Sequence, residues 1–343
     1  MRNIHSEINR RLAGVDFSRI SPGFHSFRFA IYNDTRVYFQ DSEIPWDTRF
    51  TGNTAINYNR EWIAIWNLNN FAGNFDSLAS KIVHEMFHAY QNEMGDTRWP
   101  DEIVGAFYPR DLRNFELKYR EDQLLALLAE KFDKAAWQEF KTRRASRIRL
   151  YPEAVDYEIK MEGIEGAATY AELQALKMLD TTLYREEFKK CISNLRATHK
   201  IFDVRLLSYS TGCIIQTIRN GNTLKQINWS KATLGTGEGP GVVLPDLRVK
   251  HREYYEDIDK RIQDVLASAE KLDLGETTLL LFDPYNVRSS GDYLYHPHFL
   301  AYGAYESPPN FLKGTYITSM KSRTRTIEGI WRAAPEYTQG PGT

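Results

Sequence analysis

The sequence of 343 residues predicts an α+β fold with three parts along the chain. Short runs rich in aromatic and β-branched residues, which favour β-strands, dominate residues 1–75. Apolar residues recur at helical spacing through most of residues 76–272, and strand-like runs return over residues 273–333. We therefore expect a β-rich N-terminal subdomain, a mainly helical central subdomain and a C-terminal β appendage, followed by a disordered tail at 334–343.

The N-terminal part predicts a short helix and a small sheet. Residues 1–13 have the spacing of an amphipathic helix that ends at Gly14, and Asn33-Asp34 separates two strand-like runs as in a hairpin. We expect a mixed or antiparallel sheet of three runs, which cover residues 27–32, 36–40 and 61–68.

The run at residues 61–68 precedes the most informative helix of the chain. Such a strand can form the edge of the sheet, where its open backbone N–H and C=O groups bind an extended peptide by β-augmentation. It can equally be an interior strand whose Trp62 and Trp66 pack in the core. The sequence agrees with both interpretations.

The segment from Ser77 to Met94 is predicted to be a half-buried helix. Asp76-Ser77 supplies an N-cap signal, and Gly95 is a natural stop. Between these ends, apolar residues recur at helical spacing at Leu78, Ile82, Val83, Met86 and Phe87. The helix contains His84-Glu85-Met86-Phe87-His88, which has the pattern H-E-x-x-H.

The remaining pattern predicts further helices and strands. The helices cover residues 115–150, 153–180, 185–198, 203–219 and 250–272, and the later strands cover 277–282, 293–302 and 314–320. The glycine-rich stretch 234–241 lacks the Lys-Ser or Lys-Thr of a phosphate loop, so we expect a mobile loop there. A solvated helix face is expected for a basic cluster, which consists of Lys141, Arg143, Arg144, Arg147 and Arg149.

The H-E-x-x-H segment predicts a metal site. His84 and His88 are four residues apart, so both imidazoles lie on nearly the same face of a helix and can reach one ion. Glu85 lies on the adjoining face, where its carboxylate can approach a water molecule without binding the metal. A catalytic zinc takes three protein ligands, and two candidates for the third are Glu162 and Glu165. Small residues after Glu165 would allow its helix to approach the histidine helix closely.

The motif H-E-M-F-H, followed downstream by Glu165-Gly-Ala-Ala-Thr-Tyr170, resembles the gluzincin zinc metallopeptidases. That group contains thermolysin, aminopeptidase N and leukotriene hydrolase. The resemblance covers motifs within residues 60–215 and implies a zincin-like catalytic domain. It makes His84, His88 and Glu165 the zinc ligands and Glu85 the general base. Glu162, one turn earlier, could compete with Glu165 for the metal, but we favour Glu165 as the ligand and Glu162 as its support.

Two further features bear on the resemblance. Tyr209, in Tyr209-Ser-Thr-Gly212, matches a tyrosine that donates its hydroxyl to the oxyanion in the aminopeptidase branch, although a structural tyrosine is equally compatible with the sequence. The chain has no G-x-M-E-N segment, so the resemblance does not extend to exopeptidase activity.

His296 and His298 form an H-x-H pair, which we expect to be ordinary residues of an aromatic-rich strand.

Together these features predict a zinc-dependent metallopeptidase with one catalytic Zn²⁺. Glu85 accepts a proton from the attacking water and returns it to the leaving amine, while Tyr209 helps to stabilise the oxyanion. The alternative is a zincin-fold binding module that recognises its partner through the sheet edge and the β appendage. Glu85 disfavours that alternative, because a purely structural zinc site needs no general base.

Composition limits the partners of the chain. A formal net charge of -1 creates no global field that would gather nucleic acid or an anionic membrane. Cys191 and Cys213 are too few for a disulfide framework, so we expect reduced thiols. The start of the chain has no signal-peptide pattern, and no run approaches the length of a membrane span. We expect a cytoplasmic protein with a peptide or protein substrate, and the oligomeric state stays open.

Overall fold

Helices make up the largest part of the chain, as the apolar spacing predicts. The structure, a computed structural model, describes residues 2–69, 71, 73–219 and 245–337. Its α-helices are α1 (Arg2–Leu12), α2 (Phe17–Ile20), α3 (Phe75–Glu93), α4 (Glu102–Ala106), α5 (Leu112–Glu130), α6 (Lys134–Leu150), α7 (Pro152–Leu179), α8 (Thr181–Arg196), α9 (Val204–Ile218) and α10 (Pro245–Ser268). The helical stretch predicted at 115–150 is divided between α5 and α6, because Asp133 caps a new helix by accepting a hydrogen bond from the Ala136 N–H.

The N-terminal sheet is mixed. Its strands are β1 (Phe29–Tyr32), β2 (Arg36–Tyr38), β3 (Glu43–Pro45), β4 (Thr54–Tyr58) and β5 (Glu61–Asn67), in the order β3-β2-β1-β5-β4. Strands β1 and β5 are parallel, and the other neighbours are antiparallel. Along β5, Ile63 and Ile65 join the apolar cluster on one face of the sheet, while Ala64 packs with the helices on the other face.

The C-terminal sheet is antiparallel throughout its described pairings. Its strands are β6 (Glu270–Lys271), β7 (Thr277–Phe282), β8 (Arg288–Ser290), β9 (Tyr293–His296), β10 (Phe299–Gly303), β11 (Asn310–Lys313), β12 (Tyr316–Met320) and β13 (Thr326–Arg332). The run predicted at 293–302 is divided into β9 and β10. In the tail predicted to be disordered, Pro335–Tyr337 form a short 3-10 helix, whereas 338–343 lie outside the described residues, as does the glycine-rich stretch 234–241.

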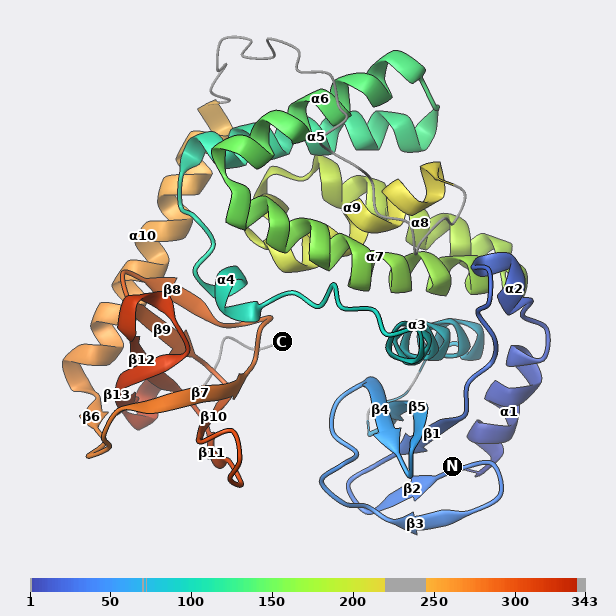
Figure 1. Ribbon diagram of the computed structural model, residues 1–343, viewed down its shortest axis with the longest axis horizontal. Helices are drawn as coiled ribbons and strands as arrows, with labels where there is room; N and C mark the ends of the chain where they lie inside the picture. Colours follow the sequence, from blue (N-terminus) through green and yellow to red (C-terminus); the bar gives the residue numbers. More distant parts are fainter. Residues whose placement is uncertain (1, 70, 72, 220–244, 338–343) are drawn as a thin grey trace.

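Helix α3 lies between α7 and the N-terminal sheet (Figure 1). Helices α5 to α9 form the upper part of the view, the N-terminal sheet lies below them, and the C-terminal sheet stands to one side along α10. Helix α3 packs on α7 above it and on β5 below it. This arrangement places the H-E-x-x-H segment between the helices and the N-terminal sheet.

Helices α7 and α9 pack closely through two glycines. A Cβ atom on Gly166 would lie 2.4 Å from the Gly212 Cα, and one on Gly212 would lie 2.5 Å from the Glu162 carbonyl oxygen. The crossing therefore requires glycine at both positions. We expected the small residues after Glu165 to serve the approach to α3, but Gly166 meets α9 instead. The close crossing holds Arg205 and Tyr209 of α9 beside Glu165.

The predicted solvated face of the basic cluster is wrong for two of its members. Arg144 and Arg147 are fully buried. Acidic residues on the neighbouring helices neutralise them: Glu121 on α5 pairs with both arginines, Glu162 pairs with Arg144, and Glu158 pairs with Arg147. Lys118 and Asp122, which form an ion pair at 3.5 Å, extend this buried charge network between α5, α6 and α7.

Asp122 should make the stability of the fold depend on pH. Burial raises the pKa of Asp122 to about 7, with the Lys118 ammonium opposing that rise. The folded state therefore binds more protons than the unfolded state between about pH 4 and pH 7, and the Asp122 contribution to stability falls as pH rises through that window. We expect Asp122→Asn to gain stability relative to wild type over the same window, by at most about 4 kcal/mol, and to level off above it. Urea unfolding at pH 5 and pH 8 measures this, and a difference that is independent of pH would contradict it.

Two other expectations concern thiols and membranes. Cys191 on α8 and Cys213 on α9 are both free and buried, and a hydrogen bond between them lowers the pKa of the Cys191 thiol. Among the described residues, the helices include none with the length and apolar character needed to cross a bilayer.

Candidate metal centre

Helix α3 carries the two candidate histidine ligands in its buried middle part. The Asn74 side chain caps the helix by accepting hydrogen bonds from the Asp76 and Ser77 N–H groups, so the helix begins two residues before the predicted start. After its last residue, Gly95 adopts a φ of 66°, which ends the helix as expected. Every residue from Ile82 to Gln91 is buried. The histidines are therefore fixed by packing on both sides of the helix.

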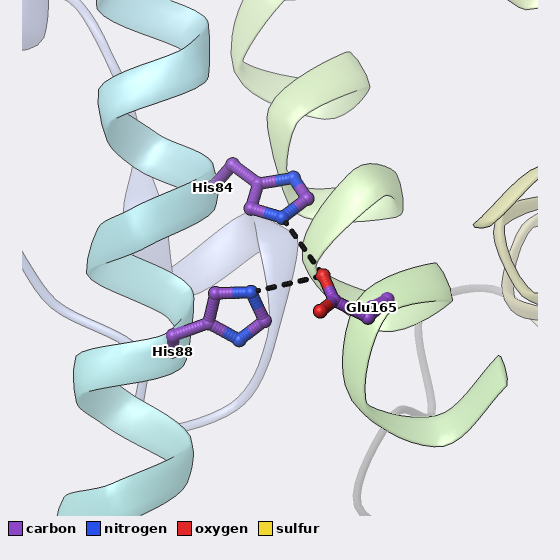
Figure 2. Close-up of side chains that lie close together, drawn as sticks. All are labelled: His84, His88 and Glu165. Atoms are coloured by element: carbon purple, nitrogen blue, oxygen red, sulfur yellow. Dashed lines mark ion pairs between the residues drawn. The ribbon is translucent and has the colours of Figure 1, made fainter. Parts of the chain in front are cut away.

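Three side chains converge on one point between α3 and α7 (Figure 2). The Glu165 Oε2 atom lies 3.4 Å from the His84 Nε2 and 3.2 Å from the His88 Nε2. Within the ranges that the structure describes, these residues form the one group of His, Cys, Asp or Glu side chains able to hold a metal ion, with ligand atoms within 4.8 Å of one another. The structure thus brings together the three residues that the sequence analysis selected.

Each histidine is oriented by a second partner on its other ring nitrogen. The His84 Nδ1 lies 3.2 Å from the Glu172 Oε2, and the His88 Nδ1 lies 2.8 Å from the Gln91 Oε1. Gln91 in turn donates to the Ile164 carbonyl oxygen on α7. An acceptor at Nδ1 holds a proton there and turns Nε2 toward the shared point, where Nε2 can give up its own proton to bind a cation, as in metal-binding histidines.

Electrostatic contacts with neighbouring side chains shift the pKa values of His84 and Glu165. Burial lowers the pKa of His84, but hydrogen bonds with Glu165 and Glu172 outweigh burial and raise that pKa well above its ordinary value. Burial raises the pKa of Glu165, but the two histidines outweigh burial and hold it well below its ordinary value. A buried carboxylate that remains charged beside two imidazoles is suited to bind a divalent cation.

Glu85 lies beside this group without joining it. Its side chain lines the same cleft and is 7% exposed. It forms no hydrogen bond or ion pair with any residue that the structure describes. Burial raises the pKa of Glu85, which moves its proton affinity toward the range useful for a general base.

Glu162 does not reach the histidines. Its two carboxylate oxygens each accept a hydrogen bond of 3.0 Å from Arg144 in the buried charge network. We expected Glu162 to support the ligands, but its carboxylate contacts Arg144 instead. Glu162 instead neutralises a buried guanidinium one helical turn from Glu165.

Tyr209, on α9, lines the same cleft. Its ring stacks on His84 at a centroid distance of 6.3 Å, and its hydroxyl oxygen accepts a hydrogen bond of 2.6 Å from the Arg205 Nη1. The Tyr285 hydroxyl, from the loop after β7, lies 3.0 Å from the Tyr209 hydroxyl. Burial and the nearby Glu165 carboxylate raise the pKa of Tyr209, so its hydroxyl keeps its proton. The tyrosine is thus placed to donate that proton.

The candidate ligands line a cleft of about 830 Å³. Aromatic side chains form much of its wall, since Trp62, Trp66 and Trp99 line it together with Tyr209 and Tyr285. The indole of Trp99 is 42% exposed, and its centroid lies 5.9 Å from that of the His88 ring. The cleft therefore combines a polar centre with an apolar rim, which is typical of sites for organic ligands.

The sheet edge along the cleft is β4, not the strand at 61–68. Strand β5 pairs with β1 on one side and with β4 on the other, so it is an interior strand. Strand β4 has one described neighbour, and Asn53, Thr54 and Ala55 line the cleft. The sequence analysis missed β4 because its polar residues Thr54 and Asn57 weaken the strand pattern. Trp62 and Trp66 are half-buried and border the cleft as well as the core.

The chain matches no protein-family model, no curated protein and no solved structure. Any conclusion about function therefore rests on the geometry of the residues in the candidate metal centre.

Sequence reasoning missed several residues around the candidate ligands that had a signal in their spacing. Glu172 follows Glu165 by seven residues, Gln91 follows His88 by three, and Arg205 precedes Tyr209 by four, so each shares a helix face with a predicted residue. Trp99 and Tyr285 lie in loops and have no such signal. Of the H-x-H pair, His296 is buried at the end of β9 and lies 3.0 Å from the Thr318 Oγ1, whereas His298 lies between β9 and β10 and contacts Asp283.

Proposed function

We propose that this chain is a zinc-dependent metallopeptidase of the gluzincin type that hydrolyses peptide bonds. The observation that carries the proposal is the convergence of His84, His88 and Glu165, with Glu85 beside them in an open cleft. A purely structural metal site needs neither an adjacent free carboxylate nor a cleft of substrate size. Both features favour the enzyme over a binding module.

The donor set fits zinc. Two imidazole nitrogens and one carboxylate oxygen are a ligand set known for catalytic zinc, and such sites leave one position open. The acceptors at the Nδ1 atoms of His84 and His88 are the outer partners that such histidines need. When bound, a zinc ion would supply a Lewis acid that makes water more acidic and polarises a carbonyl group.

The side chains around the ligands divide the remaining tasks. Glu85 accepts a proton from the attacking water at its carboxylate and returns it to the nitrogen of the leaving amine. Tyr209 donates its hydroxyl hydrogen to the substrate oxygen that gains negative charge. The burial of Glu85 and its lack of described hydrogen-bond partners support its role, because its carboxylate is not engaged by another side chain.

The cleft suits an extended peptide. An exposed strand edge offers backbone N–H and C=O groups to a peptide, and β4 provides such an edge beside the candidate ligands. The indole groups of Trp66 and Trp99 offer apolar surface to the substrate side chains. We therefore expect the substrate to bind as an added strand next to β4, with bulky apolar side chains near the scissile bond.

Metal analysis combined with peptide digestion tests the proposal. We expect purified protein to contain close to one zinc ion per chain and to cleave internal bonds in a mixture of unstructured peptides, as read by mass spectrometry. A chelator should abolish cleavage, and added zinc should restore it. Protein that binds zinc but cleaves no peptide would favour the binding module, and protein that binds no zinc would overturn the proposal.

A further inference from the structure

Arg205 joins three polar side chains beside the candidate metal centre. Its three guanidinium nitrogens bond to three partners: Nε to the Glu102 Oε1 at 3.1 Å, Nη1 to the Tyr209 oxygen at 2.6 Å and Nη2 to the Glu165 Oε1 at 3.2 Å. Its Cζ atom also lies 4.2 Å from the centroid of the Tyr285 ring. The Arg205 side chain is 11% exposed. A planar guanidinium with all nitrogens engaged is a rigid anchor.

The contact with Glu165 fixes how that carboxylate faces the histidines. Arg205 holds the Oε1 atom, while the Oε2 atom points to both His84 and His88. Without Arg205, the carboxylate could rotate about its last torsion and turn its plane away from the histidines. Arg205 therefore fixes the orientation of the Glu165 carboxylate, with one oxygen facing both imidazoles.

The contact with Tyr209 fixes the direction of the hydroxyl proton. Arg205 can only donate, so the Tyr209 oxygen must accept from it. The Tyr285 hydroxyl also lies within hydrogen-bond distance of that oxygen. When Tyr285 also donates, both acceptor positions of Tyr209 are filled, and its own proton is left to donate into the cleft.

The partners that hold Arg205 are themselves fixed by the C-terminal sheet. Glu102 is the first residue of α4, and its neighbour Ile103 is buried in the apolar cluster of that sheet. Arg325, which directly precedes β13, also forms an ion pair of 2.8 Å with Asp101, which caps α4. Tyr285 lies between β7 and β8. Figure 1 shows α4 beside this sheet, at the end of the segment that comes from α3.

We propose that the C-terminal sheet is part of the catalytic apparatus: through Glu102, Arg205 and Tyr285 it positions the ligand Glu165 and directs the proton of Tyr209. Arg205, Glu102 and Tyr285 are positioning residues. This inference rests on the proposed peptidase function and gives a role to a sheet that is otherwise remote in sequence from the H-E-x-x-H helix.

Zinc affinity separates this role from a general contribution to stability. Arg205→Lys keeps the charge but cannot hold three partners, so we expect zinc to bind about 10- to 100-fold more weakly in a chelator competition. We expect turnover to fall about 100-fold, with KM little changed, because Tyr209 loses its orientation while β4 is untouched. Tyr285→Phe keeps the ring over Arg205 and loses the hydroxyl, so its zinc affinity should match wild type while kcat falls.

Arg110→Lys is the matched control. Arg110 also bonds to a carboxylate, Asp259, and stacks over a tyrosine, Tyr255, but it lies outside the cleft. We expect this change to leave zinc affinity unaltered. If Arg205→Lys fails to fold, Glu102→Gln, which weakens the same anchor, should still weaken zinc binding relative to the control.

The outcomes distinguish the two proposals. Suppose that the wild-type chain binds zinc and cleaves peptides. If Arg205→Lys and Glu102→Gln then both bind zinc as tightly as wild type, the positioning role is overturned and the peptidase function stands. A wild-type chain that binds no zinc would overturn the peptidase function, and the positioning role with it.

Discussion

Replacing Glu85 with glutamine should abolish peptide hydrolysis while leaving the bound zinc in place. The change removes the carboxylate that accepts the proton of water but keeps the size of the side chain. General-base catalysis contributes about 10²- to 10⁴-fold to such reactions, so turnover should fall by at least that range. Zinc content should stay at the wild-type value, because the Glu85 carboxylate is not among the three converging ligands. Steady-state kinetics and metal analysis of the same preparation measure both effects.

A second glutamate on the same helix provides the control. Glu93, near the end of α3, is exposed and lies outside the cleft, so Glu93→Gln should change neither turnover nor zinc content. Cleavage that survives Glu85→Gln at the wild-type rate would show that another group accepts the proton. Loss of zinc from Glu85→Gln would instead mean that Glu85 belongs to the ligand set.

Local spacing was enough to predict the histidine helix and the convergence of its two imidazoles. The four-residue interval of His84 and His88 needs only a helix to bring the imidazoles together, and apolar residues at helical spacing predicted that helix. Glu165 could be selected through its motif. The sequence could not show which side of α7 would face α3, and the glycine that seemed suited to that contact packs against α9.

Other parts of the site depend on contacts between distant segments. Strand β4 is a sheet edge with polar residues, and its pattern alternates too weakly to be distinguished from a loop. The charges of Arg144 and Arg147 suggested a solvated face, since charged side chains are rarely buried without partners, and those partners lie on other helices. Tyr285 reaches the cleft only because the C-terminal sheet folds back beside α4.

The two glutamates of α7 should separate into one ligand and one structural residue. Glu165→Ala removes one of three candidate ligand atoms and should weaken zinc binding by more than the 10- to 100-fold typical of an outer partner. Glu162→Ala leaves the fully buried Arg144 with fewer acceptors. Breaking one partner from a buried ion pair costs about 3–5 kcal/mol, so this variant should unfold at lower urea while its folded form keeps zinc.

Chelator competition and urea unfolding on both variants measure this separation. The reverse pattern, in which Glu162→Ala loses zinc and Glu165→Ala keeps it, would assign the third ligand to Glu162 and would require α7 to rotate relative to α3. We expect Glu165→Ala to lose zinc and Glu162→Ala to keep it. A rotation of α7 would separate Gly166 from Gly212 and expose the paired Arg144 to the cleft side. The packing of α7 against α9 therefore decides which of the two carboxylates faces the histidines.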